Sequence, residues 1–136
     1  MPNSYPFPRH VRLLSSHAYQ QVFSAPVVFH GASFRVLVRA VDNPTSRLGV
    51  IVAKKQIKKA HARNRIRRLV RESFRLQQHK LPAVDIIVMV KALAAHQDNN
   101  KVFEELALLW KKLQTSNRLP SSKPVVVASL EGTNSV

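Results

Sequence analysis

The 136-residue sequence lacks cysteine and contains only three glycines and seven acidic residues. Without cysteine there is no disulfide framework, no thiolate metal site and no cysteine nucleophile. The three glycines are too far apart to build a glycine-rich phosphate loop. No apolar run approaches the roughly 18–20 residues of a membrane span, and the first eight residues carry three prolines rather than the pattern of a signal peptide. These absences lead us to expect a cytoplasmic protein.

The acidic side chains are also too scattered to form an active site. Only Glu104 and Glu105 are adjacent, and neighbours on a helix point about 100° apart, so they do not form a metal clamp. The six histidines show no metal-ligand spacing. His61 and His79 flank the most basic segment, where solvent-exposed bystanders are the more common case. We therefore expect no catalytic residue and no metal or other cofactor bound by the protein itself.

Positive charge is what the sequence has in excess, since 22 Lys and Arg residues give a formal net charge of +15. Eleven of these basic residues lie between Lys54 and Lys80, with Glu72 as the one acid among them. Evenly spread charge would favour solubility, whereas concentrated charge indicates a surface that binds a polyanion. Nucleic acid is the first candidate and an anionic membrane surface the second.

Hydrophobic periodicity predicts a helix, up to three strands, a long basic helix, a buried strand and a last helix. The expected ranges are 15–24 (helix), 27–30, 34–41 and 47–53 (strands), 58–79 (helix), 84–90 (strand) and 99–115 (helix). The expected cap is Ser15 or Ser16 for the first helix and Asp98 or Asn99 for the last. This order predicts one α+β domain over residues 1–118, with a single sheet and helices packed on it. Residues 119–136 are rich in Ser, Pro, Gly and Asn and predict a flexible tail, in which 125–130 is a candidate strand.

The strand patterns make three further predictions. Asp42-Asn43-Pro44 is turn chemistry and predicts a hairpin between strands 34–41 and 47–53. In the first of these, Phe34, Val36 and Val38 alternate with Arg35, Leu37 and Arg39, so two arginines lie on the outer face. The nearly continuous apolar run 84–90 predicts a central strand that is covered on both faces.

The basic helix separates into two faces at about 100° per residue. The apolar face holds Ala62, Ile66, Leu69, Val70, Ser73 and Leu76, and the basic arc holds Arg63, Asn64, Arg67, Arg68, Arg71 and Arg75, with Arg65 near a boundary. Like charges four residues apart destabilise a helix by a few tenths of a kcal/mol per pair, so a helix that needed only solubility would mix signs. Arginine also binds phosphate oxygens bidentately. An ordinary solvated basic face is the alternative.

The segment around this helix resembles the bacterial ribonuclease P protein component, whose signature is Arg-Asn-Arg. The residues that carry the resemblance are Arg63-Asn64-Arg65, Val52-Ala-Lys-Lys, Lys58-Lys-Ala-His, Phe7-Pro-Arg, Arg12-Leu-Leu, Tyr19, Phe23 and Leu81-Pro-Ala-Val-Asp85. The likeness covers about residues 7–117. Asn64 is informative, because charge alone would not require an amide between two arginines. Tyr19 departs from the family pattern, which more often has phenylalanine there.

The resemblance implies a fold and an activity. The implied fold is an α/β sandwich with one four-stranded sheet, the order αβββαβα and a left-handed βαβ crossover, a hand that the general preference for right-handed crossovers would not predict. The implied activity is that of an accessory subunit of an endoribonuclease, which removes the 5′ leader of precursor tRNA. The catalytic centre, with its Mg²⁺ ions, then belongs to the RNA subunit, and the expected partners are one catalytic RNA and precursor tRNA, with no membrane.

The resemblance also implies two RNA-binding surfaces. The surface for the catalytic RNA would comprise Lys54, Lys55, Lys58, Lys59, Arg63, Asn64, Arg65, Arg67, Arg68 and Arg71. The cleft for the single-stranded leader would be lined by Arg12, Tyr19, Phe23, Arg39 and either Phe34 or Phe29. For Tyr19 and Phe23, plain packing against the sheet is the alternative.

Two other functions remain open at this point. A structural RNA-binding protein, such as a small ribosomal component, would need the same basic helix. A membrane-surface protein is less favoured, because the helix has no aromatic belt beyond Phe74.

Overall fold

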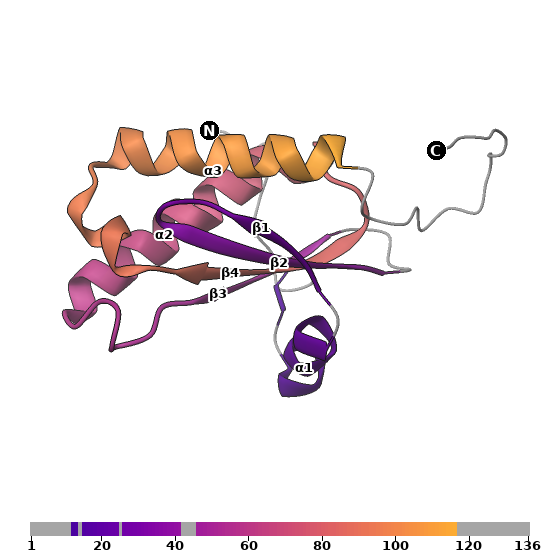
Figure 1. Ribbon diagram of the computed structural model, residues 1–136, viewed down its shortest axis with the longest axis horizontal. Helices are drawn as coiled ribbons and strands as arrows, with labels where there is room; N and C mark the ends of the chain where they lie inside the picture. The colour runs from indigo at the N-terminus through magenta and orange to yellow at the C-terminus, as the bar shows by residue number, and fades with distance from the viewer. Residues whose placement is uncertain (1–11, 14, 25, 42–45, 117–136) are drawn as a thin grey trace, which may run out of the picture.

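The computed structural model describes residues 12, 13, 15–24, 26–41 and 46–116, which form one four-stranded sheet with helices on both faces (Figure 1). The elements are α1 (Ser16–Ser24), β1 (Val27–His30), β2 (Phe34–Ala40), β3 (Arg47–Ile51), α2 (Ala60–Gln77), β4 (Val84–Val90) and α3 (Asn99–Thr115), with short 3₁₀ helices η2 (Gln78–Lys80) and η3 (Ala92–His96). The sequence therefore predicts the order and type of the α-helices and strands correctly, but not the two 3₁₀ helices. The proposed turn at 42–44, the tail 119–136 and its candidate strand lie outside the described residues.

The strand order in the sheet is β1-β2-β4-β3. Strand β4 is antiparallel to β2 and parallel to β3, so the predicted hairpin between strands 34–41 and 47–53 is wrong. Turn residues favour a change of chain direction, but they do not decide which strands pair. Six of the seven residues of β4 are apolar, and the centre of the sheet removes the most apolar surface from water, so β4 lies between β2 and β3.

The prediction of a central strand covered on both faces is confirmed, because β4 is buried along nearly its whole length. The hairpin in the sheet joins β1 and β2 and is closed by a 2.8 Å hydrogen bond from the Gly31 N–H to the Phe34 carbonyl. The parallel pair β3 and β4 is joined through α2. The left-handed sense of this crossover stays an implication of the family resemblance.

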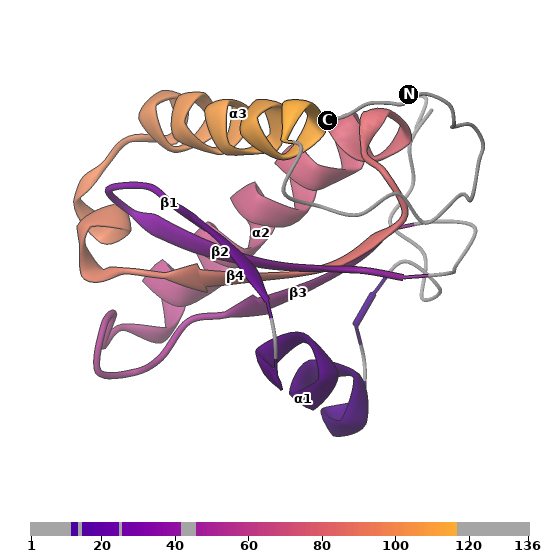
Figure 2. The same cartoon turned by 45° about the vertical axis from the view of Figure 1, so that its right-hand side comes forward.

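Helices α2 and α3 share the larger hydrophobic core on one face of the sheet (Figure 2). The indole Nε1–H of Trp110 donates a 2.8 Å hydrogen bond to the Ser73 hydroxyl, and the Trp110 ring meets the edge of Phe74 at a centroid distance of 6.1 Å. All three side chains are buried, so these contacts fix the two helices against each other. The apolar stripe of α2 packs into this core.

Helix α1 packs on the opposite face of the sheet (Figure 2). Its buried residues Ala18 and Val22 contact Leu37 of β2 and Ile87 of β4 in a second, smaller core. The predicted caps are also present: the Ser15 hydroxyl accepts from the Ala18 N–H at 3.0 Å, and the Asp98 carboxylate accepts from the Lys101 N–H at 2.8 Å. None of the helices in the described ranges is long and apolar enough to cross a membrane.

Candidate RNA interface

The outer face of α2 carries the exposed part of the predicted RNA-binding surface. Asn64, Arg68 and Arg71 are exposed on this helix, while Ile66 and Val70 are fully buried beneath it. We call these three exposed residues the basic ridge. Within the described residues the side chains of Asn64 and Arg68 have no protein partner. Their polar groups are therefore open to an anionic ligand.

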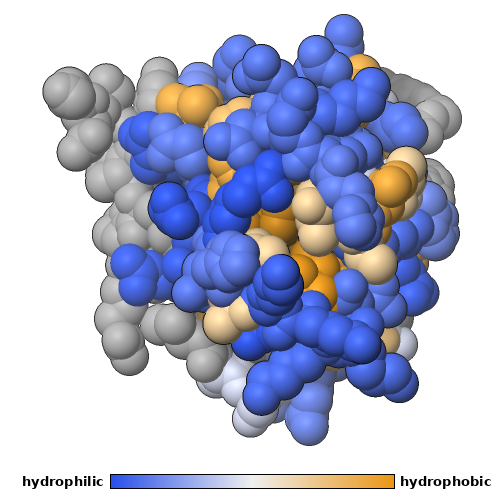
Figure 3. All heavy atoms as spheres, turned by 90° about the vertical axis from the view of Figure 1, so that its left-hand side faces the viewer, coloured by the Kyte–Doolittle hydropathy of each residue, from blue (hydrophilic) through white to orange (hydrophobic). Residues whose placement is uncertain are grey.

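The loop from 52 to 59 extends this surface toward the start of α2. Its four lysines, at positions 54, 55, 58 and 59, are all exposed, and we call this segment the lysine loop. The first turn of α2 contains no acidic residue, and its N-cap, Lys59, makes no capping hydrogen bond through its side chain. The positive end of the helix dipole and the lysines thus favour the same kind of ligand, an anion. Figure 3 looks onto this end of the molecule, which is mostly hydrophilic around a smaller apolar area.

Arg63 and Arg65, unlike Asn64 and Arg68, hydrogen-bond within the described part of the protein. Arg63 Nη1 donates to the carbonyl oxygens of Ile57 at 3.0 Å and Lys58 at 2.7 Å. Arg65 donates from Nε to Asn99 Oδ1 at 2.9 Å and from Nη2 to the Gln97 carbonyl at 2.6 Å. These partners lie outside α2 and were not predicted from its helical spacing.

Glu72 pairs with Arg75, another arginine of the basic arc. Arg75 Nε donates to Glu72 Oε1 at 3.0 Å, in an ion pair that spans three residues of the helix. The hydrogen bond from Arg75 holds the pKa of Glu72 below its usual value, although partial burial opposes this shift. The ridge therefore ends near Arg71, while Arg67 is half-buried beside it.

The face of the sheet that carries α1 is organised in rows of facing residues. In register across β2, β4 and β3, the rows are Arg39-Asp85-Arg47, Leu37-Ile87-Gly49 and Arg35-Met89-Ile51. Helix α1 covers the middle row. In the first row, Arg47 forms a bidentate pair with the buried Asp85 at 2.8 and 2.6 Å, which neutralises that carboxylate. The third row stays open beside α1.

A hollow of about 360 Å³ lies over this third row. Its lining includes exposed Arg35, the half-buried side chains of Met89 and Ile51, and Lys55 of the lysine loop. Cations and apolar side chains together suit a single nucleic-acid strand, which offers phosphates and base faces. Sequence analysis missed Arg35, although its alternation with Arg39 places both arginines on the same face.

The residues predicted for a leader cleft are only partly gathered around this hollow. Tyr19 is half-buried on α1, and the side chain of Phe23 is 44% exposed. Arg39 donates to the Gln21 side chain on α1 at 3.3 Å. Arg12 lies at the outer edge of β3, where its backbone pairs with Leu48 in an isolated β-bridge. The structure therefore places these residues around α1 without bringing all of them to one point.

Phe34 is a correction to the predicted cleft. It is fully buried in the larger core, on the face covered by α2 and α3, and Phe29 is buried in the same core. The alternation of β2 already separates Phe34 from Arg35 and Arg39, because successive side chains point to opposite faces. Phe34 therefore cannot line a cleft on the α1 face.

Tyr19 packs closely on Gly49. A Cβ atom at position 49 would lie 2.4 Å from the Tyr19 hydroxyl oxygen and 2.6 Å from Cζ, so β3 needs a glycine at this point. Burial raises the pKa of the Tyr19 hydroxyl, and the positive charges of Arg71 and Arg67 oppose this shift. The charges of α2 thus act on α1 across the edge of the sheet.

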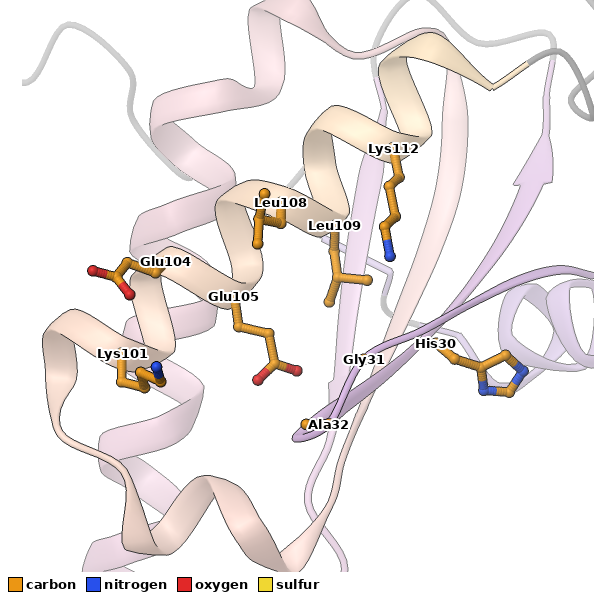
Figure 4. A pocket seen from close by; sticks show the side chains of 9 residues that line it. All are labelled: His30, Gly31, Ala32, Lys101, Glu104, Glu105, Leu108, Leu109 and Lys112. Atoms are coloured by element: carbon orange, nitrogen blue, oxygen red, sulfur yellow. The ribbon is translucent and has the colours of Figure 1, made fainter.

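A second hollow, of about 310 Å³, lies between the β1–β2 turn and α3 (Figure 4). Its lining has mixed charge, with Lys101 and Lys112 against Glu104 and Glu105, and Glu105 points toward the turn, where its carboxylate accepts from the Ser33 N–H at 2.7 Å. Opposite charges within one hollow do not favour a polyanion. In the part of the chain that the structure describes, no three metal-ligating side chains gather at one place.

Known proteins resemble this chain over most of its length. The family model described as Ribonuclease P matches residues 7–114. The ribonuclease P protein component of Photorhabdus laumondii is 42% identical over 78% of this chain and 89% of its own, and that of Pseudoalteromonas atlantica is 45% identical over 79% and 89%.

Solved structures show the same fold. The RNase P protein of Thermotoga maritima, in complex with 1-(4-fluorophenyl)-2-thiourea, superposes with a TM-score of 0.68 at 31% identity, covering 74% of this chain and 98% of that one. The RNase P protein of Staphylococcus aureus superposes with a TM-score of 0.71 at 25% identity, covering 77% and 98%. The chain therefore belongs to the ribonuclease P protein family, as an accessory protein subunit of the endoribonuclease that matures the 5′ end of tRNA.

Proposed function

We propose that this subunit binds two RNAs on adjacent surfaces. The basic ridge and the lysine loop contact the catalytic RNA subunit, and the hollow over Arg35, Met89 and Ile51 holds the 5′ leader of precursor tRNA. The observation that carries the proposal is the place of Lys55, which belongs to the lysine loop and also lines the hollow. The surface for the catalytic RNA and the hollow for the leader would thus form one continuous, positively charged path.

The protein's contribution to cleavage is electrostatic on this proposal. Catalytic RNA and precursor tRNA repel each other, and the cations of the two surfaces lower that repulsion by replacing bound counterions. The Mg²⁺ ions that activate the attacking water are held by the RNA, in a complex of one protein with one RNA in the cytoplasm. A purely structural RNA-binding protein would share the basic ridge but would not need a hollow for a second strand.

The test compares precursor tRNA with mature tRNA in the reconstituted holoenzyme. At low Mg²⁺ the wild-type protein is expected to stimulate 5′ cleavage by its cognate catalytic RNA. Arg35→Ala is expected to weaken binding of the leader-containing precursor about five- to tenfold and leave mature tRNA unchanged, because one phosphate contact or one stacked base is lost. Tyr19→Ala tests the same surface less cleanly, since Tyr19 also packs on Gly49.

The matched control is Lys101→Ala, which removes a cation from the mixed-charge hollow beside α3 and is expected to change neither affinity. Equal losses for precursor and mature tRNA in Arg35→Ala would contradict the leader assignment. Tight RNA binding without any stimulation of cleavage would favour the structural alternative.

A further inference from the structure

The two arginines that flank Asn64 are directed to different neighbours of α2. Arg63 reaches back to the carbonyl oxygens of Ile57 and Lys58, at the end of the lysine loop. Arg65 reaches to Asn99 and to the Gln97 carbonyl, at the junction between η3 and α3. Both guanidinium groups thus bond to segments outside α2, and between them Asn64 is exposed and without a protein partner in the described residues.

The helix dipole makes a cation at position 63 unfavourable, and the hydrogen bonds of Arg63 offset this cost. Arg63 lies in the first turns of α2, where the helix dipole disfavours a cation and no acidic residue is present to offset it. Two carbonyl oxygens accept from one Nη atom, and Ile57, which supplies one of them, is 3% exposed. These bonds fix the last residues of the lysine loop against α2.

The geometry at Arg65 requires a guanidinium group. Its Nε and Nη2 atoms donate to two different acceptors, an amide oxygen at 2.9 Å and a backbone carbonyl at 2.6 Å. A lysine ammonium is a single point donor and does not reproduce a planar fork. Gln97 also accepts from the Ser33 hydroxyl at 2.7 Å through its side chain, so the segment that Arg65 holds is itself anchored to the β1–β2 turn.

The lysine loop is tied down a second time at Gln56. The Gln56 side-chain oxygen accepts from the Ala92 N–H, at the start of η3, at 2.9 Å. The lysine loop is therefore joined to the start of η3 through Gln56 and to α2 through Arg63, and α2 is joined to the η3–α3 junction through Arg65. A surface built from three separate segments keeps its shape only when such cross-links hold them.

We propose that Arg63 and Arg65 are positioning residues, which fix the lysine loop and α2 in the geometry that RNA requires, while Asn64 and Arg68 make the contact. This inference rests on the proposed RNA contact of α2. It divides the Arg-Asn-Arg signature of this chain into two internal clamps and one exposed amide. Charge at positions 63 and 65 is then secondary to the hydrogen bonds made there.

The experiment measures binding of the full-length protein to its cognate catalytic RNA as a function of salt. Dissociation constants are taken between about 50 and 200 mM KCl, because each lost phosphate contact lowers the salt slope by about 0.7–0.9. The variants are Arg65→Ala, Arg65→Lys and Asn99→Ala, with Arg68→Ala as the matched contact variant. Circular dichroism selects a temperature at which every variant is folded.

We expect Arg65→Ala to weaken binding on the order of fivefold with an unchanged salt slope, and Arg65→Lys to behave in the same way despite its charge. Asn99→Ala should also weaken binding, and the double variant Arg65→Ala/Asn99→Ala should lose little more than Arg65→Ala alone. Arg68→Ala should instead lower the slope by about one contact, with an unchanged melting temperature.

Two results would overturn the inference. If Arg65→Ala lowers the salt slope as Arg68→Ala does, and Arg65→Lys restores it, Arg65 meets phosphate directly. If Asn99→Ala leaves RNA affinity unchanged, the clamp has no role in binding. An unchanged affinity and slope in Arg68→Ala would show instead that the proposed RNA contact of α2 is itself wrong, and the two failures are thus distinguishable.

Discussion

Helices α2 and α3 lie on the same face of one sheet, yet their outer faces differ. Each buries an apolar stripe in the shared core, and the Trp110–Ser73 hydrogen bond joins them. Outside that core, α2 carries six arginines and one glutamate, whereas α3 carries three lysines and two glutamates. The inner faces explain why both helices form. Only the outer faces distinguish α2, which carries the proposed contact with a polyanion, from α3.

The largest expected effect tests what the two helices share. Trp110→Ala removes a fully buried ring, its edge contact with Phe74 and its hydrogen bond to Ser73. We expect a loss of about 3–5 kcal/mol in the free energy of unfolding, as is typical for a large aromatic residue in a core. Urea denaturation measures this loss. A change below about 1 kcal/mol would show that α3 is not needed to support α2.

The next effect tests what distinguishes the two helices. Arg68→Glu on α2 and Lys111→Glu on α3 make the same change in net charge at exposed positions. We expect the first to weaken binding of the catalytic RNA about tenfold or more, and the second by less than about twofold, since only Arg68 belongs to the proposed contact with the phosphates. Filter binding at one fixed salt concentration measures both. Equal losses would mean that overall charge, and not the basic ridge, drives binding.

The smallest effect concerns the one acid in α2. Because the pKa of Glu72 is lowered in the folded protein, its pairing stabilises the fold above the unfolded-state pKa, and this contribution disappears as the pH falls through the folded-state value. Below about pH 5 the wild-type protein should therefore lose a small part of its stability. The Glu72→Gln variant lacks this contribution at every pH and should not show the loss. Thermal melts of both proteins between about pH 3 and 7 test this. A constant difference across that range would contradict the pairing.

Local patterns were sufficient to predict the elements, because helix and strand periodicity, the Ser15 and Asp98 caps and the apolar run of β4 are properties of short segments. Strand pairing is not such a property. The turn chemistry at 42–44 favoured a hairpin, but burial of β4 between β2 and β3 outweighs it. The family resemblance supplied the number of strands.

The candidate site was predictable where it depends on one element alone. Helical geometry placed Asn64, Arg68 and Arg71 on an exposed face, as the structure shows. Arg63 and Arg65 belong to the same signature, but their hydrogen-bond partners come from the loop before α2 and from the start of α3. Spacing within a helix does not reveal that Arg63 turns back to the preceding loop, nor that Arg65 has partners more than thirty residues away.

The central place of β4 also governs the order in which this protein can fold. Strands β2 and β3 hydrogen-bond to β4 and not to each other, so a growing chain cannot close its sheet until Val90 has been synthesised. The cationic helix emerges before the strand that completes its support. Because such distant pairings close large loops, they slow folding and prolong exposure of the unfinished chain. During synthesis, the basic segment is thus available to nearby RNA before the surface that gives it specificity exists.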